Sequence, residues 1–217
     1  MTTTDTAAIL ARYGQLTQAM ADYPNARLIV VSKHQPPEAL VPLLQAGQRD
    51  FGENRVQEAA SKWPALHARF PDLRLHLIGQ LQRNKVAEAA KLFDAIHSLD
   101  RPALADALAA VGYSRPLLIQ VNLAAEPQKG GVLVADLPAL ITHSRDRLGL
   151  KLVGLMTIPP QDEDAAPYFH QLAALARQHQ LPDLSMGMSE DYPQALAAGA
   201  SLIRVGSYLF SPSKPPV

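Results

Sequence analysis

The segment Leu28-Ile29-Val30-Val31-Ser32-Lys33 is an apolar run closed by a lysine, and the turn-forming residues His34-Gln35-Pro36-Pro37 follow it. A short run of branched residues closed by turn chemistry predicts a buried strand whose last side chain emerges at the mouth of the fold. We expect the Lys33 amine to be partly removed from water there. Because desolvation disfavours the ammonium form, Lys33 is a candidate nucleophile toward an aldehyde. The alternative is a rim lysine that buries its stem and keeps its head in water.

Outward from this segment, short β-rich runs alternate with longer Ala/Leu-rich amphipathic segments. A helix is expected before the first strand, within residues 1–24. The expected strands are residues 28–32, 50–53, 73–79, 95–99, 117–123, 152–158, 184–188 and 201–206. The expected helices between them are residues 38–45, 56–67, 84–92, 103–111, 136–147, 166–178 and 193–198.

This alternation determines the expected fold class. Strands separated by helices pair in parallel through crossover connections, and eight such units predict a closed (β/α)₈ TIM barrel in a single α/β domain. The 217 residues lie near the lower end of that fold's range of roughly 200 to more than 400 residues. We expect one domain over residues 1–217, with the extra helix in 1–24 and the barrel in 28–211. An open doubly wound sheet is the alternative, but the first strand–helix turn lacks a Gly-rich dinucleotide motif.

The composition argues against several classes of protein. The chain carries 20 Lys and Arg against 20 Asp and Glu, so no overall field attracts nucleic acid or a membrane surface. The absence of cysteine excludes disulfides, thiolate zinc sites and cysteine catalysis. Residues 1–6 lack the layout of a secretory signal, and no apolar stretch approaches the roughly 20 residues that span a bilayer. We therefore expect a cytoplasmic protein.

Polar residues fall at strand positions that should be apolar in a small barrel. Alternate strand residues point into a barrel, and this period places Arg204 and His76 inside, together with Gln120 and Asn122. A guanidinium inside a barrel is costly unless something pairs with it. An internal hydrogen-bond network and a bound ligand both remain open as the partner of Arg204.

A second pattern indicates an anion site. Ser189 follows the seventh expected strand as a plausible helix N-cap, and Gly206-Ser207 ends the eighth. Barrels commonly bind phosphate with the loops after these two strands, using backbone N–H groups at a helix N-terminus. A lysine on the first strand beside such a site suits a phosphorylated aldehyde.

The residues also resemble a known family along most of the chain. The motifs in question are Val31-Ser32-Lys33, Phe51-Gly52-Glu53-Asn54, Val56-Gln57-Glu58, His76-Leu77-Ile78-Gly79-Gln80-Leu81-Gln82, Asn84-Lys85, Gly154-Leu155-Met156, Ser185-Met186-Gly187-Met188-Ser189, Asp191 and Arg204-Val205-Gly206. In this order they resemble the pyridoxal phosphate homeostasis proteins (PROSC/YggS type).

The resemblance implies a barrel like the N-terminal domain of alanine racemase, with pyridoxal 5'-phosphate (PLP) held as a Schiff base on Lys33. It also implies that Arg204 faces the pyridine nitrogen. A positive charge there keeps that nitrogen unprotonated and weakens the cofactor as an electron sink. The other implied cofactor-binding residues are Ser189, Gly206 and Ser207 at the phosphate, and Asn54, His76 and Met156 around the ring.

Such proteins are regarded as PLP carriers or as regulators of vitamin B6 and amino-acid pools. The resemblance therefore implies a protein of intracellular PLP and amino-acid homeostasis without its own turnover, with no catalytic residue and no metal ligand. Its expected partners are PLP and apo PLP-dependent enzymes. We expect no nucleic-acid or membrane partner, and a monomer.

The chain departs from the family pattern in four places. Arg55 stands where an aromatic residue is usual, Gln35 replaces a frequent second lysine, and Gly130 stands where serine is common. Ser211-Pro212-Ser213 replaces the usual glycine and basic tail. None of these changes touches the lysine, arginine or phosphate motifs.

Two other functions stay open at this point. A PLP-dependent racemase or lyase of the alanine-racemase type would need a second proton acceptor opposite the lysine, for which Tyr192 and Tyr208 are the nearby tyrosines. A small phosphosugar enzyme would need a catalytic carboxylate at a strand end, with Glu53 and Asp100 as candidates.

Overall fold

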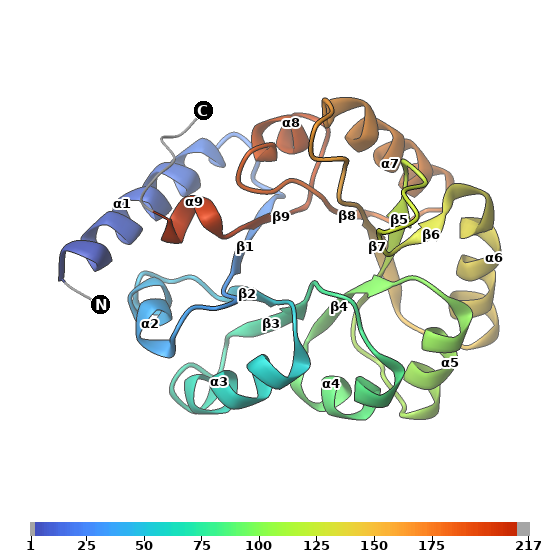
Figure 1. Ribbon diagram of the computed structural model, residues 1–217, viewed down its shortest axis with the longest axis horizontal. Helices are drawn as coiled ribbons and strands as arrows, with labels where there is room; N and C mark the ends of the chain where they lie inside the picture. The colour runs from blue at the N-terminus through green and yellow to red at the C-terminus, as the bar shows by residue number, and fades with distance from the viewer. Residues whose placement is uncertain (1–2, 212–217) are drawn as a thin grey trace.

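Eight parallel strands close into a barrel in the computed structural model, which describes residues 3–211 (Figure 1). The barrel strands are β1 (Arg27–Val31), β2 (Asp50–Glu53), β3 (Arg74–Leu77), β4 (Ala95–Leu99), β5 (Leu117–Asn122), β7 (Leu152–Met156), β8 (Asp183–Ser185) and β9 (Leu202–Val205). Their order is β4-β3-β2-β1-β9-β8-β7-β5, and the pairing of β4 with β5 closes the ring. The predicted single-domain (β/α)₈ barrel is thereby confirmed.

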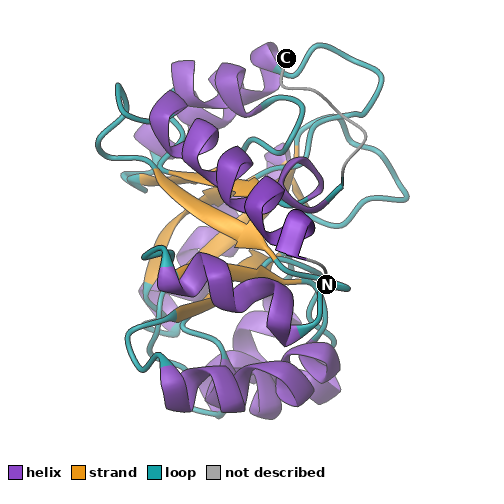
Figure 2. Ribbon diagram, turned by 90° about the vertical axis from the view of Figure 1, so that its left-hand side faces the viewer, coloured by secondary structure: helices purple, strands orange, loops and turns teal. Residues whose placement is uncertain are grey.

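Helices surround the strands on all sides (Figures 1 and 2). They are α1 (Thr3–Ala19), α2 (Pro37–Gln45), α3 (Val56–Arg69), α4 (Val86–Leu92), α5 (Pro102–Ala110), α6 (Leu137–Ile141), α7 (Ala166–Gln178), α8 (Tyr192–Ala197) and α9 (Ser207–Phe210). Proline opens α2 and α5, a position where its missing N–H costs nothing. Within the described residues, no helix is both long and apolar enough to span a bilayer.

The structure corrects the expected elements in a few places. The helix expected over 136–147 is α-helical only in α6, with a 3₁₀ turn before it (Val134–Asp136) and a π-helical turn after it (Thr142–Arg147). A two-residue strand, β6 (Val132–Leu133), pairs with β5 and is too short to show a sequence period. A 3₁₀ turn, Arg83–Lys85, precedes α4.

The expected strands 73–79 and 152–158 end two residues earlier, at Leu77 and Met156, because the chain turns there into loops. The domain limits at residues 1 and 217, and the departures at Pro212 and Ser213, lie outside the described residues.

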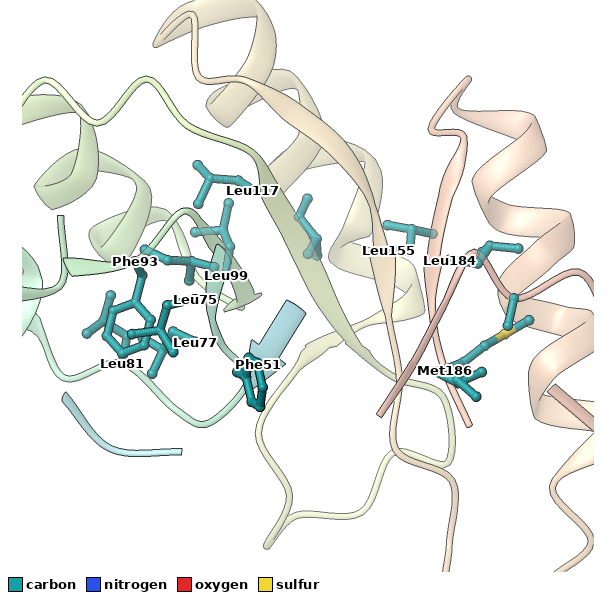
Figure 3. Close-up of a cluster of buried hydrophobic side chains, with 14 of the residues drawn as sticks. Phe51, Leu75, Leu77, Leu81, Phe93, Leu99, Leu117, Leu155, Leu184 and Met186 are labelled. Carbon is teal, nitrogen blue, oxygen red and sulfur yellow. The ribbon is translucent and has the colours of Figure 1, made fainter. Parts of the chain in front are cut away.

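The strands separate two apolar cores, as their period of two requires. The outer core lies between barrel and helices, and Figure 3 shows part of it, including Phe51, Leu75 and Leu155. The inner core is small and consists of Ile29, Leu118, Met156 and Leu202. Ile203 and Val205 belong to the outer core, so the predicted inward direction of Arg204 is confirmed.

Helix α1 completes the ring of helices. Up to residue 211, where the described part of the chain stops, the last strand is followed only by the four-residue α9, and α1 fills the remaining space between α8 and α2 (Figure 1). The Arg12 Nε donates to the Leu209 carbonyl at 2.9 Å, and the Tyr208 hydroxyl donates to Gln15 Oε1 at 3.0 Å. The first helix is therefore attached directly to the last.

Candidate functional site

A cavity of about 730 Å³ opens at the carboxyl ends of the strands. This is the face at which barrels of this kind carry their functional residues. Five of the eight residues predicted from the sequence line it, namely Lys33, Ser189, Arg204, Gly206 and Ser207. They come from the segments that follow β1 and β8 and from the end of β9, three neighbouring strands of the barrel.

The other three predicted residues are not among those that line this cavity. Met156 is fully buried in the inner core, and His76 points into the barrel toward Asp50 and His97. The Asn54 side-chain oxygen is buried without a hydrogen-bond partner among residues 3–211. A side chain on Gly79 would collide with the Asn54 backbone, because a Cβ there would lie 2.2 Å from its carbonyl oxygen.

Lys33 projects from the turn that follows β1 and lines the cavity. It is exposed in the structure, so the expected partial removal of the amine from water is wrong. The turn brings it there by a sharp change of direction, since His34 has a φ of 63°, the left-handed region that costs a non-glycine residue energy. Such a conformation persists only when surrounding contacts hold it in place.

A buried ion cluster supplies those contacts on both sides of Lys33. Ser32 donates its hydroxyl to Glu53 Oε1 at 2.8 Å, and the Ser32 carbonyl accepts from Lys62 Nζ at 2.8 Å. The His34 backbone N–H donates to Glu58 Oε1 at 2.6 Å. The backbone before and after Lys33 is therefore fixed to β2 and α3.

The cluster is held together by its own charges. Lys62 Nζ lies 2.8 Å from Glu53 Oε1 and 3.1 Å from Glu58 Oε1, and the Trp63 Nε1–H donates to Glu53 at 3.0 Å. Glu53 is 0% exposed and Lys62 is 7% exposed. Burial alone would raise the pKa of Glu58, but hydrogen bonds from the His34 backbone and from Lys62 together outweigh it and leave that pKa below its ordinary value.

Arg204 reaches the cavity from inside the barrel. Its side chain is 3% exposed, with Nη1 donating to Ser185 Oγ at 2.7 Å and Nη2 donating to the Thr157 carbonyl at 2.9 Å. Burial lowers the pKa of Arg204 to about 10, and the charge of Asp191 opposes this change. The guanidinium therefore keeps its positive charge at neutral pH.

Below Arg204, polar side chains continue across the barrel. Ser185 Oγ lies 2.8 Å from His97 Nδ1, His97 Nε2 lies 3.0 Å from His76 Nδ1, and His76 Nε2 lies 2.8 Å from Asp50 Oδ1. The other Asp50 oxygen accepts from Arg74 at 2.6 Å. We call Arg204, Ser185, His97, His76 and Asp50 the interior polar chain.

Two members of the interior polar chain besides Arg204 have shifted pKa values. Burial, reinforced by the charges of His76, Arg204 and Arg27, holds the pKa of His97 well below 6.5. Burial alone would raise the pKa of Asp50, but hydrogen bonds and charge from His76 and Arg74 outweigh it and leave that pKa below its ordinary value. At neutral pH the interior polar chain therefore contains a neutral His97 imidazole and an ionised Asp50 carboxylate.

Burial of a neutral His97 predicts a pH dependence of stability. As the pH falls below 6.5, His97 becomes protonated in the unfolded chain but stays neutral in the folded protein. The free energy of unfolding therefore decreases with decreasing pH. Between pH 7 and pH 5 we expect this loss to be about 2 kcal/mol larger in the wild-type protein than in His97→Phe. Urea titrations of both proteins at several pH values measure it, and equal losses would contradict the prediction.

The proposed anion side of the cavity is built from two segments that meet. Gly187 has a φ of 89°, and a Cβ there would lie 2.5 Å from the Ala195 Cβ, so only glycine fits this turn. Gly206 packs its backbone against Val31, where a Cβ would lie 2.9 Å from the Val31 Cβ. The loop after β8 thus packs closely against α8, and the start of α9 packs closely against β1, beside Lys33.

The expected capping role of Ser189 is wrong in detail. The N-cap of α8 is Asp191, because the chain makes a further turn after Ser189 before the helix begins. Ser189 Oγ instead accepts from the Tyr208 backbone N–H at 3.2 Å, in the first turn of α9. The hydroxyl therefore joins the two anion-side segments to each other.

Several residues that organise the site were not predicted from the sequence, mainly Ser185, His97, Thr157 and Lys62. His97 follows Ile96, an outer-core residue, on a short strand, so the alternation that found Arg204 could have found it. Lys62 gives no such signal, since a lysine on an amphipathic helix is normally solvated.

The residues that the alternative functions require lie elsewhere. Glu53 is buried in the ion cluster, and Asp100 lines a separate cavity of about 800 Å³ between α5 and the segment 131–147. Tyr208 is buried and hydrogen-bonded to α1, and Tyr192 is not among the residues that line the site.

Comparisons with known proteins agree with this architecture. The profile of the family described as "Alanine racemase, N-terminal domain" matches residues 4–214. The crystal structure of alanine racemase from Corynebacterium glutamicum has a TM-score of 0.75 at 17% identity, covering 98% of this chain and 62% of that chain. At this identity the likeness concerns the fold alone. The fold and site define a barrel protein of the alanine-racemase N-terminal class.

Relatives with higher sequence identity show which family within this class the chain belongs to. The pyridoxal phosphate homeostasis protein of Aquifex aeolicus is 40% identical over 202 residues, covering 87% of this chain and 88% of the relative. The structure of PipY from Synechococcus elongatus with PLP bound has a TM-score of 0.80 at 40% identity, covering 94% of this chain and 100% of that chain. The chain belongs to the pyridoxal phosphate homeostasis protein family, as its motifs indicated.

Proposed function

We propose that this protein binds PLP and takes part in intracellular PLP and amino-acid homeostasis. The observation that carries the proposal is the convergence of Lys33, Arg204 and the segments around Ser189 and Ser207 on one cavity. The relatives named above support it, since one is named for PLP homeostasis and another has been solved with PLP bound.

The residues present fit the chemistry of the cofactor. Lys33 lines the cavity and would hold PLP as a Schiff base through its aldehyde. The cavity, at about 730 Å³, is large enough for a drug-sized ligand. Ser189, Gly206 and Ser207 would hold the phosphate group. Arg204 would donate a hydrogen bond to the pyridine nitrogen, while Asn54, His76 and Met156 would act on the ring from deeper in the barrel.

The protein has no turnover of its own in this proposal. When bound, PLP supplies electron withdrawal from an attached amine, but a guanidinium at the pyridine nitrogen weakens that withdrawal. The partners would be PLP and apo PLP-dependent enzymes, and we expect the protein to act as a monomer in the cytoplasm, with the whole chain 1–217 as one PLP-binding domain.

One experiment tests the proposal directly. The visible absorbance of the purified protein is recorded with added PLP, before and after borohydride reduction, and the modified peptide is identified by mass spectrometry. We expect a Schiff-base band that reduction fixes on Lys33. Absence of the band, or labelling spread over exposed lysines, would overturn the proposal. Incubation with L- or D-amino acids tests the expected lack of turnover, and steady loss of an amino acid would favour the racemase alternative.

Replacing Arg204 by alanine is expected to weaken PLP binding about tenfold or more, because a hydrogen bond from a charged group contributes about 1.5–3 kcal/mol. The absorbance maximum of bound PLP should also shift, since the charge next to the ring is lost. Equilibrium titration and spectra of Arg204→Ala measure both effects. If affinity and spectrum match those of the wild type, Arg204 does not contact the cofactor.

A further inference from the structure

Arg204 is an unusual buried charge. Among the ion pairs of the described residues none includes its guanidinium, and its hydrogen bonds go to a hydroxyl and a carbonyl, Ser185 Oγ and Thr157 O. A buried cation normally requires a carboxylate or several well-oriented acceptors. The carboxylate connected to Arg204 by hydrogen bonds is Asp50, at the far end of the interior polar chain.

The chemistry of the groups determines the direction of each hydrogen bond in this chain. A guanidinium only donates and a carboxylate only accepts. Asp50 therefore accepts from His76 Nε2, and Ser185 Oγ accepts from Arg204. Between these ends, every bond is satisfied when His97 Nε2 donates to His76 Nδ1 and the Ser185 hydroxyl donates to His97 Nδ1.

If the hydrogen bond between the two histidines ran in the opposite direction, the Ser185 hydroxyl would be left without an acceptor. If His97 carried its hydrogen on Nδ1, Ser185 Oγ would accept from both His97 and Arg204, and its own hydrogen would have no acceptor among the bonds that the structure gives it. A buried hydroxyl without an acceptor costs about 1–3 kcal/mol. The geometry therefore selects one tautomer of His97, with hydrogen on Nε2.

We propose that His97 and Ser185, supported by His76 and Asp50, are positioning residues that set the orientation of Arg204 in the cofactor cavity. The hydroxyl of a serine rotates freely. When the Ser185 O–H donates to an acceptor on the side away from Arg204, a lone pair of Ser185 Oγ is directed toward the guanidinium. His97 is that acceptor, and it reaches across the barrel from β4 to β8 to provide it. The inference rests on the proposed PLP site, because it concerns what Arg204 presents to the ring.

The main test is a double-mutant cycle on PLP affinity and on the absorbance maximum of bound PLP. His97→Phe removes the acceptor and is expected to lower affinity about tenfold, a coupling typical of residues in one hydrogen-bond network, and to shift the maximum in the same direction as Arg204→Ala. In His97→Gln the amide oxygen can accept and the amide NH₂ can donate, so this variant should restore the affinity and the absorbance maximum towards the wild-type values. In the Arg204→Ala background, His97→Phe should have no further effect.

Ser98→Ala is the matched control. Ser98 neighbours His97 on β4, is equally buried, and donates to the Gly79 carbonyl at 2.7 Å outside the interior polar chain. We expect it to leave the absorbance maximum unchanged, whatever it does to stability. If Ser98→Ala shifts the maximum as much as His97→Phe does, the effect is general and the inference is overturned.

A second measurement does not need the cofactor. Long-range proton–nitrogen NMR of the ligand-free protein identifies the tautomer of each histidine, and we expect His97 to carry its hydrogen on Nε2. Hydrogen on Nδ1 would overturn the inference while leaving the proposed function intact. Absence of a PLP band in the wild type would instead overturn the proposed function and, with it, the role of His97 toward the cofactor. If the wild type binds PLP and His97→Phe leaves its affinity and spectrum unchanged, the inference about His97 is overturned and the proposed function stands.

Discussion

Lys33→Ala is expected to abolish covalent capture of PLP and to lower its affinity at least about 100-fold, which is about 2.7 kcal/mol. Only the hydrogen bonds to the ring and phosphate remain in this variant, because the bond to the aldehyde cannot form. Absorbance spectra and equilibrium titration measure the loss, and mass spectrometry after borohydride should find no modified peptide.

Lys129→Ala is the control for this variant. Lys129 also lines the cavity, but its Nζ pairs with Glu126 at 2.6 Å and donates to the Pro159 carbonyl at 3.0 Å. We expect the control to keep the band and the labelled Lys33 peptide. A band that survives in Lys33→Ala and disappears in Lys129→Ala would move the covalent site to the other lysine.

Replacing Lys62 by methionine is expected to lower the free energy of unfolding by about 3–5 kcal/mol, the typical result of removing one partner from a buried ion pair. Methionine keeps much of the side-chain volume, so the effect reports on charge. The Glu53 carboxylate, which is 0% exposed, would be left without a cation. The Ser32 carbonyl would also lose its donor, and the backbone beside Lys33 would be less fixed. Urea unfolding of both proteins measures the change.

Two comparisons separate this effect from a general loss of contacts. Lys85→Met removes a half-exposed ion pair with Glu88 at 3.1 Å and should cost less than about 1 kcal/mol. The double variant Glu53→Gln/Lys62→Met removes both charges and should recover most of the stability, because no uncompensated charge remains buried. A double variant no more stable than Lys62→Met would show that packing, and not charge, dominates.

Much of the fold was predictable because its signals are local. Strand alternation depends only on neighbouring residues, and it predicts that Arg204 and His76 point into the barrel. The order of the elements predicts the barrel, and the prolines of the turn 34–37 mark the start of α2. The cavity followed from the rule that strand ends meet on one face.

The rest depends on contacts between residues that are distant in the sequence. His97 and Ser185 are 88 positions apart and meet only because β4 and β8 face each other across the closed barrel. Lys62 looks like an ordinary surface lysine until α3 packs behind β2. The capping role predicted for Ser189 was wrong for a more local reason, because one extra turn before α8 makes Asp191 the N-cap.

The contact between α1 and α9 has a consequence for the order in which the protein is made. Arg12 and Leu209 are 197 positions apart, so the first helix leaves the ribosome long before its partner exists. Contacts of such large separation are slow to form and come late in folding. The segment that begins α9 also carries Gly206 and Ser207 of the cavity wall. We therefore expect the ligand-binding wall to be completed when α9 closes the ring, so that a nascent chain still lacking α9 cannot yet hold the cofactor phosphate.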